Sequence, residues 1–352
     1  MRLAGPAFLL LVAASARASS ISDQISAGTS QATPQNPRAG SVSNLLRASM
    51  DLGEQWTLSA DAQITLEEPT PAPPGAAAGF QDRGGTVTDF SASLDWEATD
   101  NWTLGFTLDL SPESTISSNA QVPLQSGTGD ALIRATSSNA SIELLAAYDT
   151  AGISDLEWSF TGAIGIGRFE TMQRLAAAQR SDGTNLSTAD LRTECSPLRS
   201  RCHALMPAID GLSDELRSAR ISGGALATIR ADTDVGVNAD YYAYADDPAN
   251  VGVFPIAAVG RFGAGAPIAP LRWLVRPVVA HRFGVFSLKL WAQAGQYVAD
   301  VGQGTAGLGL KAQYRLSRSF RTWISASGQR DVASSGQVSR TGVLALGAAY
   351  RF

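Results

Sequence analysis

Charged side chains at alternate positions are the residues of this chain whose types and spacing could do chemistry. Between residues 42 and 158 the charges on the polar face of alternating segments are mostly acidic, and from Arg220 onward they are mostly basic. Facing walls of opposite charge act electrostatically on ions and polar solutes that pass between them. The acidic set is Asp51, Asp61, Glu67, Asp89, Asp95, Asp109, Glu143 and Glu157. The basic set is Arg220, Arg230, Arg272, Arg276, Lys289, Lys311, Arg315, Arg321 and Arg351, with Asp240 as an acidic exception.

The other motifs in the sequence do not support an enzyme. Gly302–Gly307 matches a dinucleotide-binding pattern, but that pattern needs a strand before it and a helix after it, and alternating segments flank it on both sides. His203 and His281 are the two histidines of the chain, too few and too far apart for a zinc site. The net charge of −5 gives no basic footprint for nucleic acid. We therefore expect no catalysis, no cofactor, no metal and no nucleic-acid partner.

The elements that position the charges are β-strands. In Trp56–Leu66 the side chains of Leu58 and Ile64 share one face, and Asp61 lies on the other. This period of two indicates a strand, and similar segments recur to the end of the chain. After the N-terminus no stretch approaches the ~20 apolar residues of a transmembrane helix. If the protein spans a membrane, a closed barrel is the architecture that remains, because an open sheet edge cannot lie in hydrocarbon.

The last ten residues, 343–352, carry apolar side chains at every second position. The alternating set is Leu344, Leu346, Tyr350 and Phe352, with alanine at 348 between them. This pattern resembles the C-terminal signal of bacterial outer-membrane β-barrels. The resemblance implies an antiparallel, up-and-down transmembrane barrel that lies in the cell outer membrane among its lipids. It also implies that the barrel-assembly machinery recognises the closing strand.

The N-terminus has the organisation of a signal peptide. Arg2 supplies a positive charge, residues 7–14 form a short apolar run, and Ala16-Arg17-Ala18 is a small-x-small cleavage site. We expect residues 1–18 to be removed on export. Residues 19–352 would then form a single barrel domain.

The connections between strands alternate in length, as they do in outer-membrane barrels. Short connections lie near Gly53, Thr99, Ala151, Asp232, Arg282 and Arg318, and longer loops, among them Pro112–Gly129, are expected between them. An even strand count requires a first strand near Ile21, which would pair with the last strand. The sequence therefore predicts about 14 strands, with residues 251–260 left open as loop or an additional strand.

The longest connection, residues 171–216, is expected to fold on the extracellular side. Met172–Arg180 and Ala208–Leu216 are predicted as short helices, the second with Ser213 as its N-cap. Cys195 and Cys202 lie six residues apart in an exported chain, which predicts a disulfide. The loop could act as a gate in the mouth, meet partners outside, or be a stiffened surface loop.

These patterns predict an outer-membrane channel for passive diffusion of small polar solutes through a charged lumen. Alternatively, the facing charges could pair across a closed lumen, in a barrel that serves a secretion, polysaccharide-export or envelope-spanning complex with an unknown partner. A barrel like the fatty-acid transporters, for apolar solutes, is the third possibility. It is less favoured because such barrels begin with an N-terminal hatch and the predicted first strand starts directly after Ala18.

Overall fold

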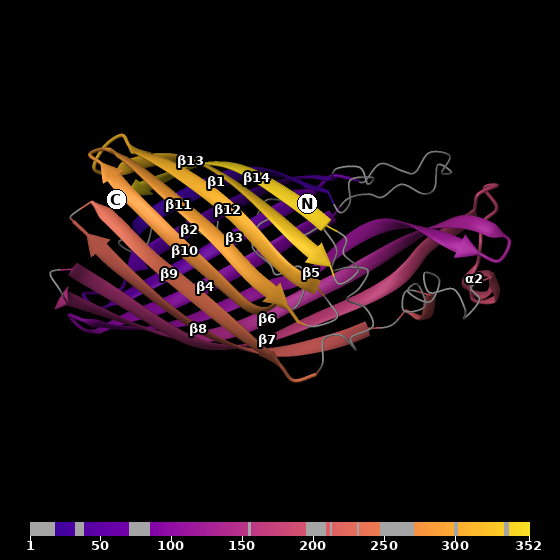
Figure 1. Cartoon of the computed structure of the whole chain (residues 1–352), viewed down its shortest axis with the longest axis horizontal. Helices are drawn as coiled ribbons and strands as arrows, with labels where there is room; N and C mark the ends of the chain where they lie inside the picture. Colours follow the sequence, from indigo (N-terminus) through magenta and orange to yellow (C-terminus); the bar gives the residue numbers. More distant parts are fainter. Residues whose placement is uncertain are drawn as a thin grey trace.

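A computed structural model describes residues 18–31, 39–69, 85–153, 156–194, 209–211, 213–230, 232–246, 271–298, 302–333 and 338–352. Fourteen antiparallel strands form a closed barrel in which each strand pairs with its neighbours in the sequence (Figure 1). The predicted class and strand number are therefore confirmed. The predicted signal peptide up to residue 17, Cys195, Cys202 and residues 251–260 lie outside the described residues.

The strands are long, as the crossing of a membrane requires. Their bounds are β1 Ala18–Gln31, β2 Ala39–Asp51, β3 Trp56–Glu67, β4 Gly85–Thr99, β5 Trp102–Leu124, β6 Gly127–Ile153, β7 Leu156–Arg180, β8 Ser213–Ile229, β9 Thr233–Tyr244, β10 Leu271–Phe283, β11 Phe286–Tyr297, β12 Gly302–Arg315, β13 Phe320–Ala333 and β14 Val338–Arg351. A short helix, α2, spans Thr188–Glu194. No helix within the described ranges is long and apolar enough to cross a membrane.

The first and last strands close the barrel. Ile21 of β1 lies opposite Tyr350 of β14, and Ile25 lies opposite Leu346. Both residues of each pair point outward, so one register places the terminal apolar positions and the first strand on the same lipid-facing surface. The predicted pairing of the chain end with the region of Ile21 is confirmed.

The outer surface of the barrel is apolar because alternate side chains of every strand point outward. Ile64, Ile166, Ile221, Leu308 and Leu346 are exposed on it, although they are large hydrophobic residues. Aromatic pairs gather near the short turns, including Trp56 stacked on Trp96 with ring centroids 5.7 Å apart. Rings at this level are typical of the interface between membrane and water.

Short turns join the strands at one end of the barrel and longer connections join them at the other. In outer-membrane barrels the short turns face the periplasm. We therefore call the end that carries Asn101, Gly284 and the last residue, Phe352, the periplasmic end. The opposite end is the outer end.

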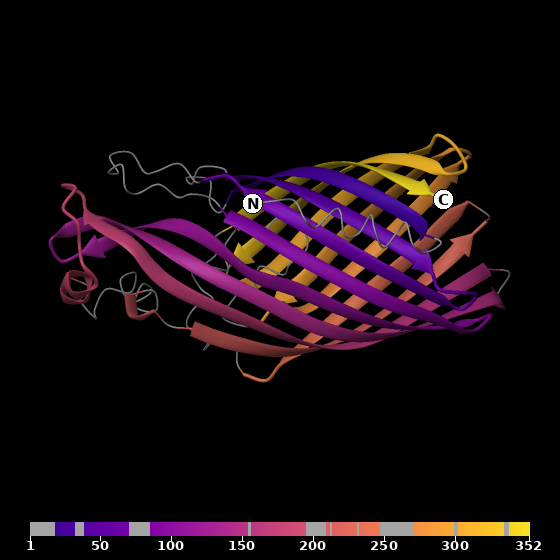
Figure 2. The same ribbon diagram turned by 180° about the vertical axis from the view of Figure 1, so that it is seen from behind.

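Strands β5, β6 and β7 continue well beyond the outer end of the barrel (Figures 1 and 2). They have 23, 27 and 25 residues, whereas the other strands have 12–17. The expected loop between Pro112 and Gly129 is instead the tip of a β-hairpin that turns at residues 125–126. We call the part of β5–β7 beyond the barrel, together with α2, the outer extension.

The helix predicted at Met172–Arg180 is wrong, and so is the end of the second predicted helix from Ser213 onward, although Ile209 and Asp210 within it are helical. Met172–Arg180 is the end of β7, paired along its length with β6, and Ser213 is the first residue of β8 rather than a helix N-cap. Helix propensity is a weak preference, and the unpaired edge of β6 supplies backbone partners that override it. Helix α2 lies between these segments, where neither prediction placed one.

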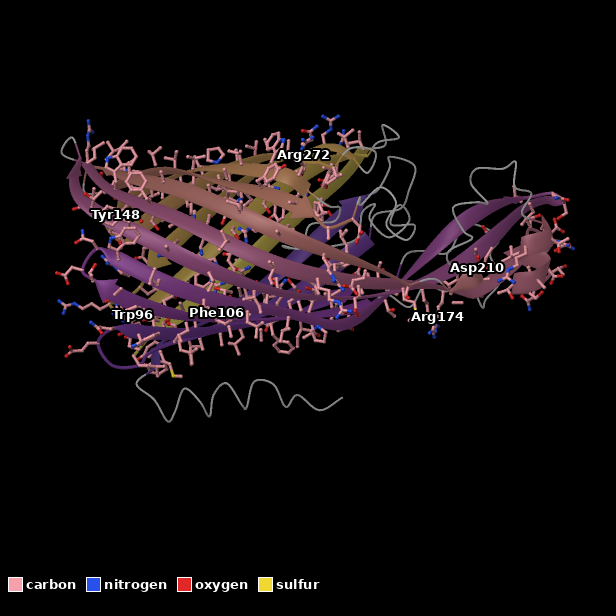
Figure 3. The ribbon with its side chains drawn as sticks, turned by 90° about the horizontal axis from the view of Figure 1, so that it is seen from below. Trp96, Phe106, Tyr148, Arg174, Asp210 and Arg272 are labelled. Carbon is pink, nitrogen blue, oxygen red and sulfur yellow. The ribbon has the colours of Figure 1, made fainter. Side chains whose placement is uncertain are left out.

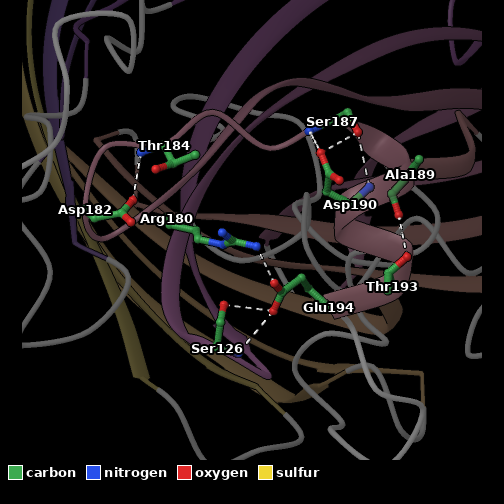
Figure 4. Close-up of polar contacts among 9 residues, drawn as sticks. All are labelled: Ser126, Arg180, Asp182, Thr184, Ser187, Ala189, Asp190, Thr193 and Glu194. Atoms are coloured by element: carbon green, nitrogen blue, oxygen red, sulfur yellow. Dashed lines mark hydrogen bonds and ion pairs between the residues drawn. The ribbon is translucent and has the colours of Figure 1, made fainter.

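The outer extension has buried side chains of its own. They are Leu124, Ala131, Leu132, Ala178, Leu186, Leu191 and Ile209. Glu194 at the end of α2 links three segments, because it accepts hydrogen bonds from the backbone and the hydroxyl of Ser126 and pairs with Arg180 at 2.5 Å (Figure 4). Ser187 and Asp190 cap the N-terminus of the helix through reciprocal hydrogen bonds.

Candidate functional site in the barrel lumen

The predicted charged residues lie on two contiguous arcs of the wall. The acidic set belongs to β2–β7 and the basic set belongs to β8–β14 or the turn after β8, so the arcs face one another in the closed barrel. Arg230 lies in the β8–β9 turn with a φ of 59°, and Arg272 lies at a bulge of β10 near the outer rim (Figure 3). Glu67 is the last residue of β3, at the outer end.

Much of the acidic arc is bonded to its immediate neighbours. Asp61 pairs with Arg47 of β2 at 2.7 Å. Asp109 accepts a hydrogen bond from Ser141 at 3.1 Å, and Asp89 accepts one from Ser111 at 2.5 Å. These carboxylates therefore interact within their own half of the wall.

The two arcs meet in a group of ion pairs that we call the central network: Glu143, Arg220, Asp240 and Arg276. Arg220 contacts Glu143 and Asp240, each at 2.7 Å, and Arg276 contacts Asp240 at 2.5 Å. The Asp240 side chain is 1% exposed. Two guanidinium groups compensate for the hydration that this buried carboxylate loses.

Directly outward of the central network, the lumen wall is apolar. Seven side chains form what we call the apolar lumen patch: Phe169, Leu216, Tyr242, Tyr244, Leu271, Leu274 and Tyr297. Leu274 lies opposite Asp240 in the strand register, and the Tyr242 ring lies 6.0 Å from the Arg220 guanidinium carbon. The patch therefore begins where the network ends, and it occupies the outer half of the lumen on β7–β11.

Two of the three tyrosines of the apolar lumen patch, Tyr244 and Tyr297, have hydrogen-bond partners for their hydroxyl groups. Tyr244 donates to the Leu271 backbone carbonyl at 2.7 Å, and Tyr297 donates to Asp331 at 2.6 Å. Gln329 donates to the same carboxylate at 2.9 Å. With their polar ends held, these rings present their apolar surface in fixed orientations.

The periplasmic half of the lumen is cationic on β11–β13. Lys289 of β11 lies directly opposite Lys311 of β12, and Arg315 lies opposite Arg321. Like charges in these positions repel one another. Among the residues that the structure describes, no ion pair to a carboxylate is formed by these four cations. We call this surface the basic wall.

Tryptophan rings lie flat against the lumen side of the basic wall. Trp323 lies over Gly347 of the neighbouring strand, where an added Cβ would be 2.3 Å from its ring, and it donates a hydrogen bond to Gln24 at 3.1 Å. Trp291 covers Gly309 in the same way. The Lys311 ammonium lies 4.3 Å from the Trp323 ring centre, which adds a cation–π contact.

The residues that the sequence pattern did not reveal are those of the apolar lumen patch and the two lumen tryptophans. The alternating pattern is interpreted with every apolar residue on the lipid face. Apolar residues that face the lumen are therefore not identified by it. One signal was available: near the outer ends of β9 and β10, Tyr241–Tyr244 and Trp273–Val275 are bulky and apolar at consecutive positions. A strand that is apolar on both faces is typically covered on both faces.

The lumen has the chemistry of a binding surface rather than of a reaction centre. Its carboxylates contact arginines and hydroxyl groups. Within the described ranges, no three His, Cys, Asp or Glu side chains are grouped so that they could hold a metal ion. His281 bonds to Thr233 near a periplasmic turn, away from the central network.

Comparison with known proteins places this geometry in a wider group. No family model matches the chain, and no curated protein matches it by sequence. Solved structures do match along nearly the whole length. The monoaromatic hydrocarbon channel CymD aligns with a TM-score of 0.57 and 10% identity, over 99% of this chain and 93% of its own. This chain has the fold of an outer-membrane β-barrel.

Two further structures support the same fold. A FadL homologue of Pseudomonas aeruginosa aligns with a TM-score of 0.54 and 13% identity, over 95% of this chain and 90% of its own. The toluene transporter TodX of Pseudomonas putida aligns with a TM-score of 0.52 and 11% identity over the same shares. CymD and TodX are named as a channel and a transporter, in agreement with the prediction that this barrel is not an enzyme.

Proposed function

We propose that this barrel is a channel through which small apolar solutes, in particular monoaromatic hydrocarbons, enter across the outer membrane. The observation that supports the proposal is the apolar lumen patch, which lines the outer half of the lumen with four buried side chains and three packed against them. The transport of toluene and of monoaromatic hydrocarbons by barrels of the same fold adds support. Diffusion of polar solutes, the first expectation from the sequence, becomes the second candidate.

The apolar lumen patch suits an aromatic solute in both shape and strength of binding. Tyr242 and Tyr244 are partly exposed and offer ring faces and edges, and each aromatic pair contributes about 0.5–1.5 kcal/mol beyond the burial of area. A few such contacts make a weak site. Weak binding is what passage requires, because a solute must leave the site as readily as it enters.

The central network sets the inner limit of this site. Arg220, Asp240 and Arg276 present charges that an apolar molecule cannot hydrogen-bond, so contact with them would remove water from charged groups without replacing it. An apolar solute is therefore expected to reside against the patch rather than on the network. Selectivity for apolar solutes would therefore follow from the contrast between the apolar lumen patch and the adjacent central network.

Uptake by cells that lack their own major outer-membrane channels tests the proposal. Cells that make the full-length protein should accumulate radiolabelled toluene several times faster than cells without it. Leu274→Asn places an amide within the apolar lumen patch and should remove most of this gain. Leu45→Asn is the matched control, because Leu45 faces the lumen on β2, outside the patch.

The outcome that would overturn the proposal is equally specific. If wild-type protein gives no acceleration while it is present and heat-modifiable on gels, as folded barrels are, the lumen does not carry toluene. If both asparagine variants reduce uptake equally, the effect comes from barrel stability and the patch has no special role.

A second candidate, a channel for small anions or polar solutes, rests on the basic wall. Lys289, Lys311, Arg315 and Arg321 would attract anions in the periplasmic half of the lumen. A planar-bilayer recording tests it directly. Discrete conductance steps with a preference for chloride over potassium would support it, and a trace that stays at baseline would exclude an open ionic path.

A further inference from the structure

A groove runs across the lipid-facing surface of β5–β9 near its outer edge. Its volume is about 650 Å³, within the range of about 300–1,000 Å³ that is typical of small-molecule sites. The strand register explains the groove. Leu108, Ile142, Ile166, Ala219 and Ala243 lie opposite one another in a single row across the five strands. The row changes from bulky to small side chains at Ala219, so the surface is recessed over β8 and β9.

The next row outward is cationic. Arg168 and Arg217 lie directly opposite one another, and both line the groove. One row further out, Glu170 lies opposite Glu215. Arg168 pairs with both glutamates, and Arg217 donates from Nε to Glu215 at 2.6 Å.

The arginines of this row stay accessible. Their side chains are 56% and 71% exposed, and within the described part of the chain the two terminal nitrogens of Arg217 make no hydrogen bond or ion pair. A guanidinium group carries five N–H donors in a fixed fork that matches phosphate oxygens. Arg217 therefore retains the donors that a phosphate would need, next to an apolar groove.

From the groove outward, the rows of side chains change from apolar to charged, and the outer leaflet changes in the same direction from acyl chains to charged headgroups. Acyl chains cover the apolar belt, and phosphate-bearing headgroups begin where the outward side chains become charged. On β7 that change occurs between Ile166 and Arg168, and on β8 between Ala219 and Arg217. The groove lies just below the change and the arginines lie just above it.

We propose that this groove binds one acyl chain of a phosphorylated glycolipid of the outer leaflet, and that Arg168 and Arg217 bind its phosphate. The site lies on the outside of the barrel, on β5–β9. It does not depend on what passes through the lumen. A lipid held there would order the surface at the base of the outer extension, since β7 continues into that extension.

The chain offers a matched control on another part of the wall. A second lipid-facing groove of about 610 Å³ lies over β10–β13, and Leu290, Leu308 and Ala326 are among its lining residues. No charged residue lines it. If chain-shaped recesses alone retained lipid, both grooves would do so. If the phosphate contact matters, only the groove beside Arg217 should bind a phosphorylated lipid more tightly than the same lipid without phosphate.

Native mass spectrometry of the full-length barrel released from detergent tests the proposal with bisphosphorylated lipid A as the probe. Dephosphorylated lipid A, with the same chains, and inorganic phosphate separate the contributions of chain and headgroup. We expect one bound lipid A, an affinity roughly tenfold lower after dephosphorylation, and no competition by phosphate, since a charge-assisted hydrogen bond contributes on the order of a tenfold change.

Variants then locate the site. Ala219→Trp fills the groove and should abolish retention of both lipids, whereas Ala326→Trp fills the second groove and should leave retention unchanged. Arg217→Gln should lower the affinity for bisphosphorylated lipid A roughly tenfold and leave that for the dephosphorylated lipid unchanged. Equal effects of the two tryptophan variants, or no effect of Arg217→Gln, would overturn the proposal. Because Arg217→Gln alters no lipid-facing apolar side chain, it remains informative even if Ala219→Trp fails to assemble.

Discussion

The outer and periplasmic halves of the lumen differ in chemistry, although many of the same strands line both. Leu274 and Tyr297 belong to the apolar lumen patch on β10 and β11, and Lys289 lies further down the same β11 on the basic wall. The central network separates the two halves on β6–β10. The polarity of this lumen therefore changes with depth along a strand and not just between opposite walls.

This difference has a consequence for transport. A lumen that was cationic throughout would favour anions, and one that was apolar throughout would retain an apolar solute too firmly. A patch of limited depth, bounded by charge, can take an apolar solute from the outer mouth without a continuous apolar lining. The following predictions change one half, or the boundary, and leave the other half intact.

The largest effect is expected at the boundary. Asp240→Ala removes the carboxylate that joins Arg220 to Arg276 and leaves two guanidinium groups near one another. Removal of one partner of a buried pair costs about 3–5 kcal/mol, and we expect about 3 kcal/mol because both arginines are partly exposed. Urea unfolding in detergent micelles, followed by tryptophan fluorescence, measures the loss of unfolding free energy.

Asp61→Ala is the control for that prediction. It breaks an ion pair of the same kind on the same lumen surface, but its partner Arg47 is 57% exposed. An exposed pair contributes about 1 kcal/mol or less. Equal destabilisation by the two substitutions would mean that burial of Asp240 has no special weight, and the boundary between the halves would lose its structural basis.

The next effect is expected in the periplasmic half. Gly347→Ala places a methyl group 2.3 Å from the Trp323 ring, which must then leave its position over β14 and its contact with Lys311. Overpacking of this kind costs about 1–3 kcal/mol. The same unfolding experiment applies, and near-ultraviolet circular dichroism should report the change at the ring.

Gly342→Ala on the same strand serves as its control. The nearest atom to an added Cβ there is 3.9 Å away, so its effect should lie within about 0.5 kcal/mol. If Gly347→Ala proved as mild as Gly342→Ala, the tryptophan would not be fixed by the glycine, and the rigid aromatic surface assigned to this half would be wrong.

The sequence revealed the direction, number and pairing of the strands, because these depend on the local alternation of apolar and polar residues. Tyr350 and Phe352 set the direction of the last strand, and the count back from them gave 14 strands and the pairing with Ile21. The same alternation separated the acidic and basic arcs. It also identified Asp240 as an acidic exception among basic residues, and the structure shows that this exception is the buried centre of the network.

Features that depend on contacts between distant segments could not be read from the sequence. Pro112 and the polar residues after it suggested a loop, whereas pairing with β6 keeps the segment extended. Met172–Arg180 has helix-forming composition and became strand for the same reason. The apolar lumen patch gathers Phe169 with residues more than a hundred positions away, and alternation within one strand carries no information about such neighbours.

A smaller effect, on ion selectivity rather than on stability, should distinguish the periplasmic half of the lumen from the outer half. Lys289→Gln combined with Lys311→Gln removes two facing charges of the basic wall without change of length. If ions pass, the preference for chloride over potassium should fall by roughly twofold or more, because pore-lining charges set the local ion concentration. Toluene uptake should stay unchanged, since the apolar lumen patch is untouched. Reduced toluene uptake with unaltered folding would show that the two halves act as one site.

The smallest effect concerns the outer extension, which should not contribute to either half. Hydrogen bonds from Ser126, followed by contact with Arg180, hold the pKa of Glu194 below its ordinary value of 4.5. A lowered pKa in the folded state stabilises the docking of α2 above pH 4.5, and this contribution is lost as the pH falls further, through the folded-state pKa. The protection factors of the α2 amides, which correct for the pH dependence of intrinsic exchange, should therefore be high at pH 6 and should fall as the pH is lowered below 4.5. Glu194→Gln should already show fast exchange at pH 6, yet leave toluene uptake at neutral pH unchanged. A fall in uptake would instead make the outer extension part of the outer half of the lumen, and the comparison between the halves would have to include it.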